Sequence, residues 1–204
     1  GFRVIGNIYW VGGEYGSYLI TTPQGHILLD TGTNEMQSVI VSNVKKLGFK
    51  MEDIKVILSS HAHWDHVQGL PFFVPTLRDG AYFDIYGPEQ EDGRSVRDVF
   101  ESIIKPPMFP VSVNSLPGTF VFHDVANDEF SIGGLDVMSR LVPHVGNTLG
   151  YRVSHRGTSV VYLPDHQMPE DGSMAITPGA RELCEGADLL IHDAQYTPEE
   201  FAGK

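Results

Sequence analysis

The stretch HAHWDH at residues 61–66 carries the strongest signal in the sequence. His61 and His63 lie two residues apart, so in an extended backbone their imidazole rings point the same way and can bind one cation. Asp65 and His66 follow directly, where a turn would direct them at a second cation nearby. Imidazole and carboxylate groups suit zinc, with manganese and iron as alternatives. Because chance produces such a pattern in roughly one comparable chain in a thousand, the stretch predicts a metal site.

The residues before this stretch predict strands followed by a helix. A short apolar run directly before the motif reads as a buried strand, and functional loops often follow such strands. Gly48 is expected to end the helix, which Thr33 or Asn34 is expected to cap. The expected strands, of which the first three are antiparallel, are Val4–Trp10, Ser17–Thr22, His26–Asp30 and Lys55–Leu58.

The residues after the motif again predict strands with helices between them. Residues 70–74 are expected to form a short helix, and Ser95–Ile104 and Ala180–Glu185 two longer ones. The expected strands are Ala81–Tyr86, Thr119–Phe122, Leu135–Val142, Leu149–Val153, Ser159–Leu163 and Leu189–His192. The pattern predicts an α/β protein with two sheets covered by outer helices. With 204 residues and 41% hydrophobic content, we expect a single domain over residues 1–204.

Two polar residues later in the chain are candidates for the metal ligands that the motif does not itself provide. His144 and Asp165 each follow an apolar strand. Either alone is more often a turn or capping residue, but together with the motif they predict metal ligands on the same rim. The expected first site is His61, His63 and His144, and the expected second site is Asp65, His66 and Asp165.

The predicted chemistry is hydrolysis by a dinuclear centre. Water between two cations is acidified to a pKa near ~7, which gives a bridging hydroxide at neutral pH. Asp65 is expected to orient that water, and His192, at the end of the last strand, to protonate a leaving group or stabilise an oxyanion. A hydrogen-bonded strand-end histidine without catalytic function explains His192 equally well. His166 is expected to support its neighbour Asp165 from outside the ligand shell.

The composition of the chain favours a small-molecule substrate over an extended nucleic acid or a membrane as its binding partner. The formal net charge of −12 argues against an extended nucleic acid, because phosphate contacts need Lys and Arg. Two bound cations would still attract a small phosphodiester. No apolar run approaches the ~18 residues of a membrane span. Cys184 is the only cysteine and reads as a small core residue. We expect a cytoplasmic protein and leave secretion open.

These residues resemble the metallo-β-lactamase superfamily, whose motif is His-x-His-x-Asp-His followed by a distant His, a bridging Asp and a final His. The resemblance covers essentially the whole chain. It implies a four-layer αβ/βα sandwich (the metallo-β-lactamase fold) with a two-metal site, most commonly two Zn²⁺ ions, at one edge. A bridging Asp165 implies phosphodiesterase chemistry.

Two parts of the chain resemble different branches of that superfamily. GNIYWVGG, GSYLITTPQGHILLDTG and KLGFKMEDIKVILSSHAH resemble β-lactamases with a histidine-rich site. HWDHVQGLPFF, KPPMFPV, VPHVGNTLGYRV and LLIHDAQYTPEEF resemble phosphodiesterase-type members related to ribonuclease Z and to cyclic-nucleotide phosphodiesterases. This change predicts a chimera with its junction near residues 61–65.

The C-terminus departs from the phosphodiesterase-like branch. No histidine follows His192, and the chain stops at Phe201-Ala202-Gly203-Lys204. The resemblance therefore implies that the final ligand and the last C-terminal elements are absent. His192, His166 or water would substitute in the second site. One sheet edge would be open, and a second copy in a homo-oligomer could cover it.

Three functions remain open from the sequence. The first is hydrolysis of a small phosphodiester, the second is hydrolysis of a β-lactam or lactone, and the third is a metal-binding scaffold with little activity. Pocket loops decide the substrate. The candidates for lining such a pocket, for most of which core packing is the more frequent role, are Trp64, Phe72, Phe73, Met108 and Phe109.

Overall fold

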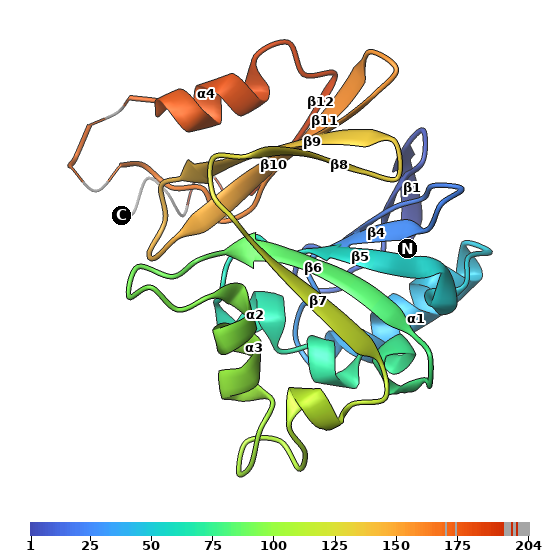
Figure 1. The fold of residues 1–204 in the computed structure, drawn as a ribbon. Helices are drawn as coiled ribbons and strands as arrows, with labels where there is room; N and C mark the ends of the chain where they lie inside the picture. The colour runs from blue at the N-terminus through green and yellow to red at the C-terminus, as the bar shows by residue number, and fades with distance from the viewer. Residues whose placement is uncertain (170, 174, 194–196, 198, 200–204) are drawn as a thin grey trace. The chain divides into compact units, whose positions relative to one another are not determined.

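The computed structural model describes residues 1–169, 171–173, 175–193, 197 and 199. The chain divides into two compact units, residues 1–126 and 127–204 (Figure 1). Residues 201–204, on which the predicted C-terminal departure rests, lie outside the described residues. The expectation of a single domain stays a prediction.

The first unit is built on a seven-stranded sheet in the order β1 to β7. Neighbouring strands are antiparallel from β1 to β4 and parallel from β4 to β7. Parallel neighbours direct the ends of β4 and β5 to the same edge of the sheet, where the histidine motif begins. The strands are β1 (Phe2–Ile5), β2 (Ile8–Trp10), β3 (Tyr18–Ile20), β4 (His26–Leu29), β5 (Ile54–Leu58), β6 (Tyr82–Pro88) and β7 (Thr119–Val125).

Helices α1, α2 and α3 lie on one face of this sheet (Figure 1). They span Met36–Lys46, Trp64–Val67 and Val96–Ile103. Short 3-10 helices cover Met51–Asp53, Leu70–Phe72, Val74–Leu77 and Val113–Ser115. Apolar side chains of the helices and of β5 and β6 form one buried core. In the described part of the chain, no helix is long and apolar enough to cross a membrane.

Two local expectations for this unit are wrong. The expected strand Val4–Trp10 is a hairpin, because Gly6 takes a positive φ of 54° and turns the chain between β1 and β2. The N-cap of α1 is Glu35, which makes no side-chain capping bond, so neither Thr33 nor Asn34 caps the helix. The expected stop is confirmed: Gly48 has a φ of 88°, and its N–H donates to the carbonyl of Lys45.

The second unit is a five-stranded sheet in the order β12-β11-β10-β9-β8, with α4 against one face. Among the described strands of this unit, only β12 runs parallel to its neighbour. Gly150 allows α4 to approach, because a Cβ there would lie 2.3 Å from Leu163 and 2.6 Å from Leu183. The elements are β8 (Glu129–Ile132), β9 (Leu135–Val142), β10 (Thr148–His155), β11 (Thr158–Leu163), α4 (Pro178–Cys184) and β12 (Leu189–His192).

Candidate metal centre

The motif of the first unit forms a compact cluster, here called the motif cluster: His61, His63, Asp65 and His66. His63 has an extended backbone (φ −66°, ψ 151°), and its ring lies 4.5 Å from that of His61 between centroids. Asp65 and His66 belong to α2, and Oδ2 of Asp65 lies 3.4 Å from Nε2 of His66. The ring centroids of His61 and His66 are 4.2 Å apart. The four side chains therefore lie close together within this unit, with Asp65 and His66 on the helical turn that follows the extended backbone of His63. Their binding of two cations stays a prediction.

A buried carboxylate behind the cluster orients two of its histidines, His61 and His66. Asp30 directly follows β4 and is fully buried. Its Oδ2 lies 2.9 Å from Nδ1 of His66 and accepts a 2.8 Å hydrogen bond from Oγ of Ser60. Its Oδ1 accepts a 2.8 Å hydrogen bond from the backbone N–H of Ser60. Oγ of Ser60 in turn lies 3.0 Å from Nδ1 of His61.

These contacts favour one tautomer in both rings. A carboxylate accepts only, so the proton of neutral His66 lies on Nδ1, between that nitrogen and Asp30. Because Oγ of Ser60 donates its own proton to Asp30, it accepts from Nδ1 of His61. Each lone pair is then on Nε2, the atom that would bind a cation. A carboxylate that orients a histidine in this way also raises the basicity of the ring.

Asp30 was not predicted as a functional residue. It has a positive φ of 54°, a conformation that Asp tolerates better than most residues. Its backbone N–H donates to the carbonyl of Leu58, and Oγ of Ser17 donates to its carbonyl. The available signal was an Asp-Thr-Gly sequence directly after an apolar strand. A lone acidic residue at that position reads as a turn, because its partners come from a later segment.

In the second unit, His144 and Asp165 are neighbours. His144 follows β9, and Asp165 follows β11 with a positive φ of 52°. Nε2 of His144 lies 4.0 Å from Oδ2 of Asp165, and its Nδ1 lies 3.3 Å from Oε1 of Gln167. A backbone hydrogen bond of 2.9 Å from Gln167 to the carbonyl of Pro143 ties the two loops together. His144 and Asp165 therefore lie close together within this unit, and their expected place on one rim with the motif stays a prediction.

His166 and His192 form a second pair in this unit. Nδ1 of His166 lies 3.0 Å from Nε2 of His192, with the rings edge to face. Nδ1 of His192 donates to the carbonyl of Asp193. When both rings are neutral, His192 therefore accepts on Nε2 and His166 donates to it. Burial, followed by the nearby His192, lowers the pKa of His166. Asp193, the acidic residue directly after His192, thus sets the tautomer of this ring through its backbone carbonyl.

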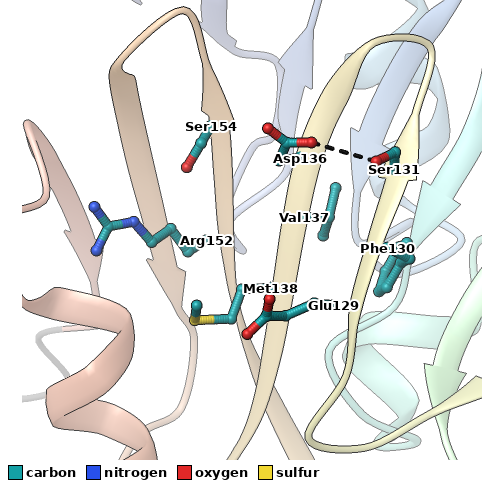
Figure 2. Close-up of a pocket in the computed structure, with 8 residues that line it drawn as sticks. All are labelled: Glu129, Phe130, Ser131, Asp136, Val137, Met138, Arg152 and Ser154. Atoms are coloured by element: carbon teal, nitrogen blue, oxygen red, sulfur yellow. Dashed lines mark hydrogen bonds between the residues drawn. The ribbon is translucent and has the colours of Figure 1, made fainter.

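A hollow of about 290 Å³ in the same unit lacks the groups for this chemistry. Figure 2 shows its lining on three adjacent strands, β8, β9 and β10. Asp136 accepts a hydrogen bond from Ser131 there, and the guanidinium of Arg152 donates to the carbonyls of Leu183 and Glu185. The lining contains no histidine, so we assign no metal or catalytic function to this hollow.

Residues 26–203 match the family described as the β-lactamase superfamily domain. The chain belongs to the β-lactamase superfamily. Because the match extends on both sides of residues 61–65, both parts belong to this one superfamily. A junction between two of its branches stays a prediction.

Curated relatives include ribonuclease Z enzymes. The enzyme from Prochlorococcus marinus strain AS9601 is 26% identical over 188 residues, which cover 86% of this chain and 54% of the relative. The chain thus spans about half the length of these relatives. An N-acyl homoserine lactonase of a Bacillus species is 32% identical over 82 residues, covering 29% of this chain and 33% of the relative.

Solved structures of metallo-β-lactamases share the fold. A subclass B3 enzyme isolated from a soil metagenome library is 25% identical, with a TM-score of 0.59 over 94% of this chain and 78% of its own. The MIM-2 metallo-β-lactamase is 23% identical, with a TM-score of 0.66 over 93% of this chain and 74% of its own. The chain is therefore a member of a superfamily of hydrolases and has the metallo-β-lactamase fold, a fold that implies divalent metal ions.

Proposed function

We propose that this protein hydrolyses a small phosphodiester with the help of two divalent cations, most readily Zn²⁺. The observation that carries the proposal is the motif cluster, in which the buried Asp30 orients His66 directly and His61 through Ser60. Three imidazoles and a carboxylate are the donor set that zinc prefers, and Mn²⁺ or Fe remain alternatives. The cytoplasmic location remains part of this proposal.

In this proposal, His61, His63 and His144 bind one cation, and Asp65, His66 and Asp165 bind the second. Membership of the superfamily supports the assignment, as does the local clustering of these residues within each unit. When bound, the two cations acidify a water molecule and offset the charge of the phosphoryl oxygens.

The protein groups around the cations have separate functions. Asp65 accepts a proton from the attacking water and orients it. His192 stabilises charge on the leaving-group oxygen, and it donates a proton only when it is itself protonated, because its neutral Nε2 accepts from His166. Asp30 and Ser60 keep the Nε2 atoms of His61 and His66 available for binding.

Two observations favour a small phosphodiester. The relatives that cover most of the chain are named ribonuclease Z, so phosphodiester cleavage is chemistry available to this superfamily. The net charge of −12 disfavours a long polyanion, because few cationic side chains can contact its phosphates. A short diester needs only the charge that the two cations supply.

The test is metal content by elemental analysis, together with the hydrolysis rate of a chromogenic phosphodiester. We expect close to two cations per chain and a metal-dependent rate. Asp165→Ala should lower both, the rate by at least about tenfold. The matched control is Asp136→Ala, a carboxylate of the same unit that lines the hollow of Figure 2. One cation or fewer, with no metal-dependent rate, would instead support a metal-binding scaffold.

Hydrolysis of a β-lactam or a lactone is the second candidate. It is favoured by the similarity to a subclass B3 metallo-β-lactamase at 25% identity. The similarity to an N-acyl homoserine lactonase over 82 residues favours it as well. The same preparation assayed with a chromogenic cephalosporin separates the two functions. A kcat/KM higher for the cephalosporin than for the phosphodiester would replace the first proposal with the second.

A further inference from the structure

A small apolar hollow in the first unit lies beside the motif cluster, and the proposed metal site does not use it. Its volume is about 90 Å³. The lining includes Trp64, Gln68, Phe72, Ile103, Met108 and Phe109. Four of the five residues expected from the sequence to line a pocket therefore do so. The fifth, Phe73, is fully buried in the core.

The lining is mostly apolar, includes three aromatic rings and carries no charged side chain. The rings of Phe72 and Phe109 meet edge to face, with centroids 5.5 Å apart. Trp64 and Met108 are 48% and 68% exposed. Clustered, exposed apolar side chains around a concave surface are typical of a ligand-binding site.

One polar group is available at this aromatic surface. Oε1 of Gln68 accepts a 3.0 Å hydrogen bond from the backbone N–H of Asn34, which fixes the orientation of the amide. Among the described residues, no acceptor pairs with its amide nitrogen. Gln68 can therefore donate to a ligand, and it carries no charge that would attract a phosphate.

Residues that line the hollow lie on the same short helix as two of the proposed metal ligands. Trp64 and Gln68 are four residues apart, so they lie on the same side of α2 and its C-cap. Asp65 and His66 belong to the same four-residue helix, which is about 6 Å long. A group bound in the hollow would thus be joined by a short linker to a group at the metal ligands.

We propose that this hollow, here called the ring pocket, binds the pyrimidine base of a nucleoside phosphodiester. The assignment rests on the proposed phosphodiester hydrolysis and names its substrate class. The aromatic side chains would stack on the base, and Gln68 would donate to a ring carbonyl.

Size and polarity support a single ring. A volume of about 90 Å³ corresponds to about three waters at ~30 Å³ each, which suits one small ring. Sites for entire ligands are larger, about 300–1,000 Å³, so the ring pocket is a subsite. A saturated acyl chain would fill the apolar space but would leave the amide nitrogen of Gln68 desolvated and unpaired, which is unfavourable.

The test compares two p-nitrophenyl diesters that share a leaving group, one of thymidine monophosphate and one of ethyl phosphate. We expect a higher kcat/KM for the thymidine ester. Phe109→Leu, which keeps apolar volume, should lower this preference about fivefold or more, since stacking contributes about 1–3 kcal/mol per base and 1.4 kcal/mol is tenfold. Gln68→Glu keeps the acceptor for Asn34, removes the donor and should also lower the preference. The control is Leu77→Ala, an exposed apolar residue outside the pocket.

Fluorescence provides a measurement that needs no turnover. The chain has two tryptophans, so Trp10→Phe leaves Trp64 as the only one. We expect thymidine to quench its emission saturably and inorganic phosphate to leave it unchanged. Quenching without hydrolysis of either ester would support the ring pocket and contradict the proposed function.

Three results would overturn the ring pocket. Equal kcat/KM for the two esters would leave phosphodiester hydrolysis standing and remove the base assignment. An octyl p-nitrophenyl phosphate preferred as strongly as the thymidine ester would make the hollow a general apolar site. Absence of both quenching and hydrolysis would contradict the pocket and the proposed function together.

Discussion

The buried carboxylate of Asp30 links the folding of the first unit to its proposed chemistry. Asp30→Asn keeps the shape of the side chain but presents an amide N–H in place of an acceptor to Ser60 or His66. The ring of His66 would then place its proton on Nε2, the nitrogen needed for a cation. We expect metal affinity to fall about 10–100-fold, measured by competition with a chromophoric chelator.

Asp84→Asn is the matched control for this substitution. Asp84 also contacts a histidine of the first unit, with its Oδ1 2.8 Å from Nε2 of His123, but neither residue belongs to the motif cluster. Metal affinity should therefore stay unchanged. An equal loss in both variants would show that Asp30 acts through general stability and not through the tautomer of His66.

At the scale of secondary structure, local patterns predicted most elements. The bounds of β9 and β12 match the expected strands Leu135–Val142 and Leu189–His192, because apolar runs with clear turn signals define them. β8 was missed, because Glu129–Ile132 has only four residues, none of them fully buried. The motif cluster follows from spacing alone, but the contact between Asp30 and His66 joins residues 36 positions apart, which no local pattern reveals.

Gly69 makes a testable prediction about the turn that follows α2. Its φ of −71° suits any residue, but a Cβ would lie 2.2 Å from Nε2 of Gln37 and 2.3 Å from the carbonyl of Thr31. Thr31 also donates to the carbonyl of His66, so this turn supports the motif cluster. Gly69→Ala should lower the free energy of unfolding by about 1–3 kcal/mol through overpacking, measured by urea denaturation.

Gly13→Ala is the control for the crowding expected in Gly69→Ala. A Cβ at Gly13 would meet its nearest neighbour, a methyl group of Val39, at an ordinary distance of 3.6 Å. We expect a change within about 0.5 kcal/mol, as is usual for substitutions away from crowded sites. If Gly69→Ala were equally mild, the segment around Thr31 would be able to move aside, and its supporting function would be ruled out.

For the whole molecule, stability should depend on pH partly through His26. Burial lowers the pKa of this ring below its ordinary value, while the negative charge of Asp53 acts in the opposite direction. The unfolded chain therefore binds a proton at a higher pH than the folded protein does. Stability from this group is complete above about pH 6.5, the ordinary pKa, and is lost as the pH falls through the folded pKa.

His26→Asn tests this linkage, because an amide oxygen can replace Nδ1 as acceptor for the N–H of Thr22 but does not titrate. Unfolding free energies of both proteins would be measured in urea on either side of pH 6.5. The wild type should lose more stability on acidification than the variant. In the wild type the unfolded chain gains a proton at His26 before the folded protein does, whereas the asparagine of the variant gains none in either state. Parallel pH profiles would show that His26 titrates alike in both states, and the acid sensitivity would then come from other histidines and carboxylates.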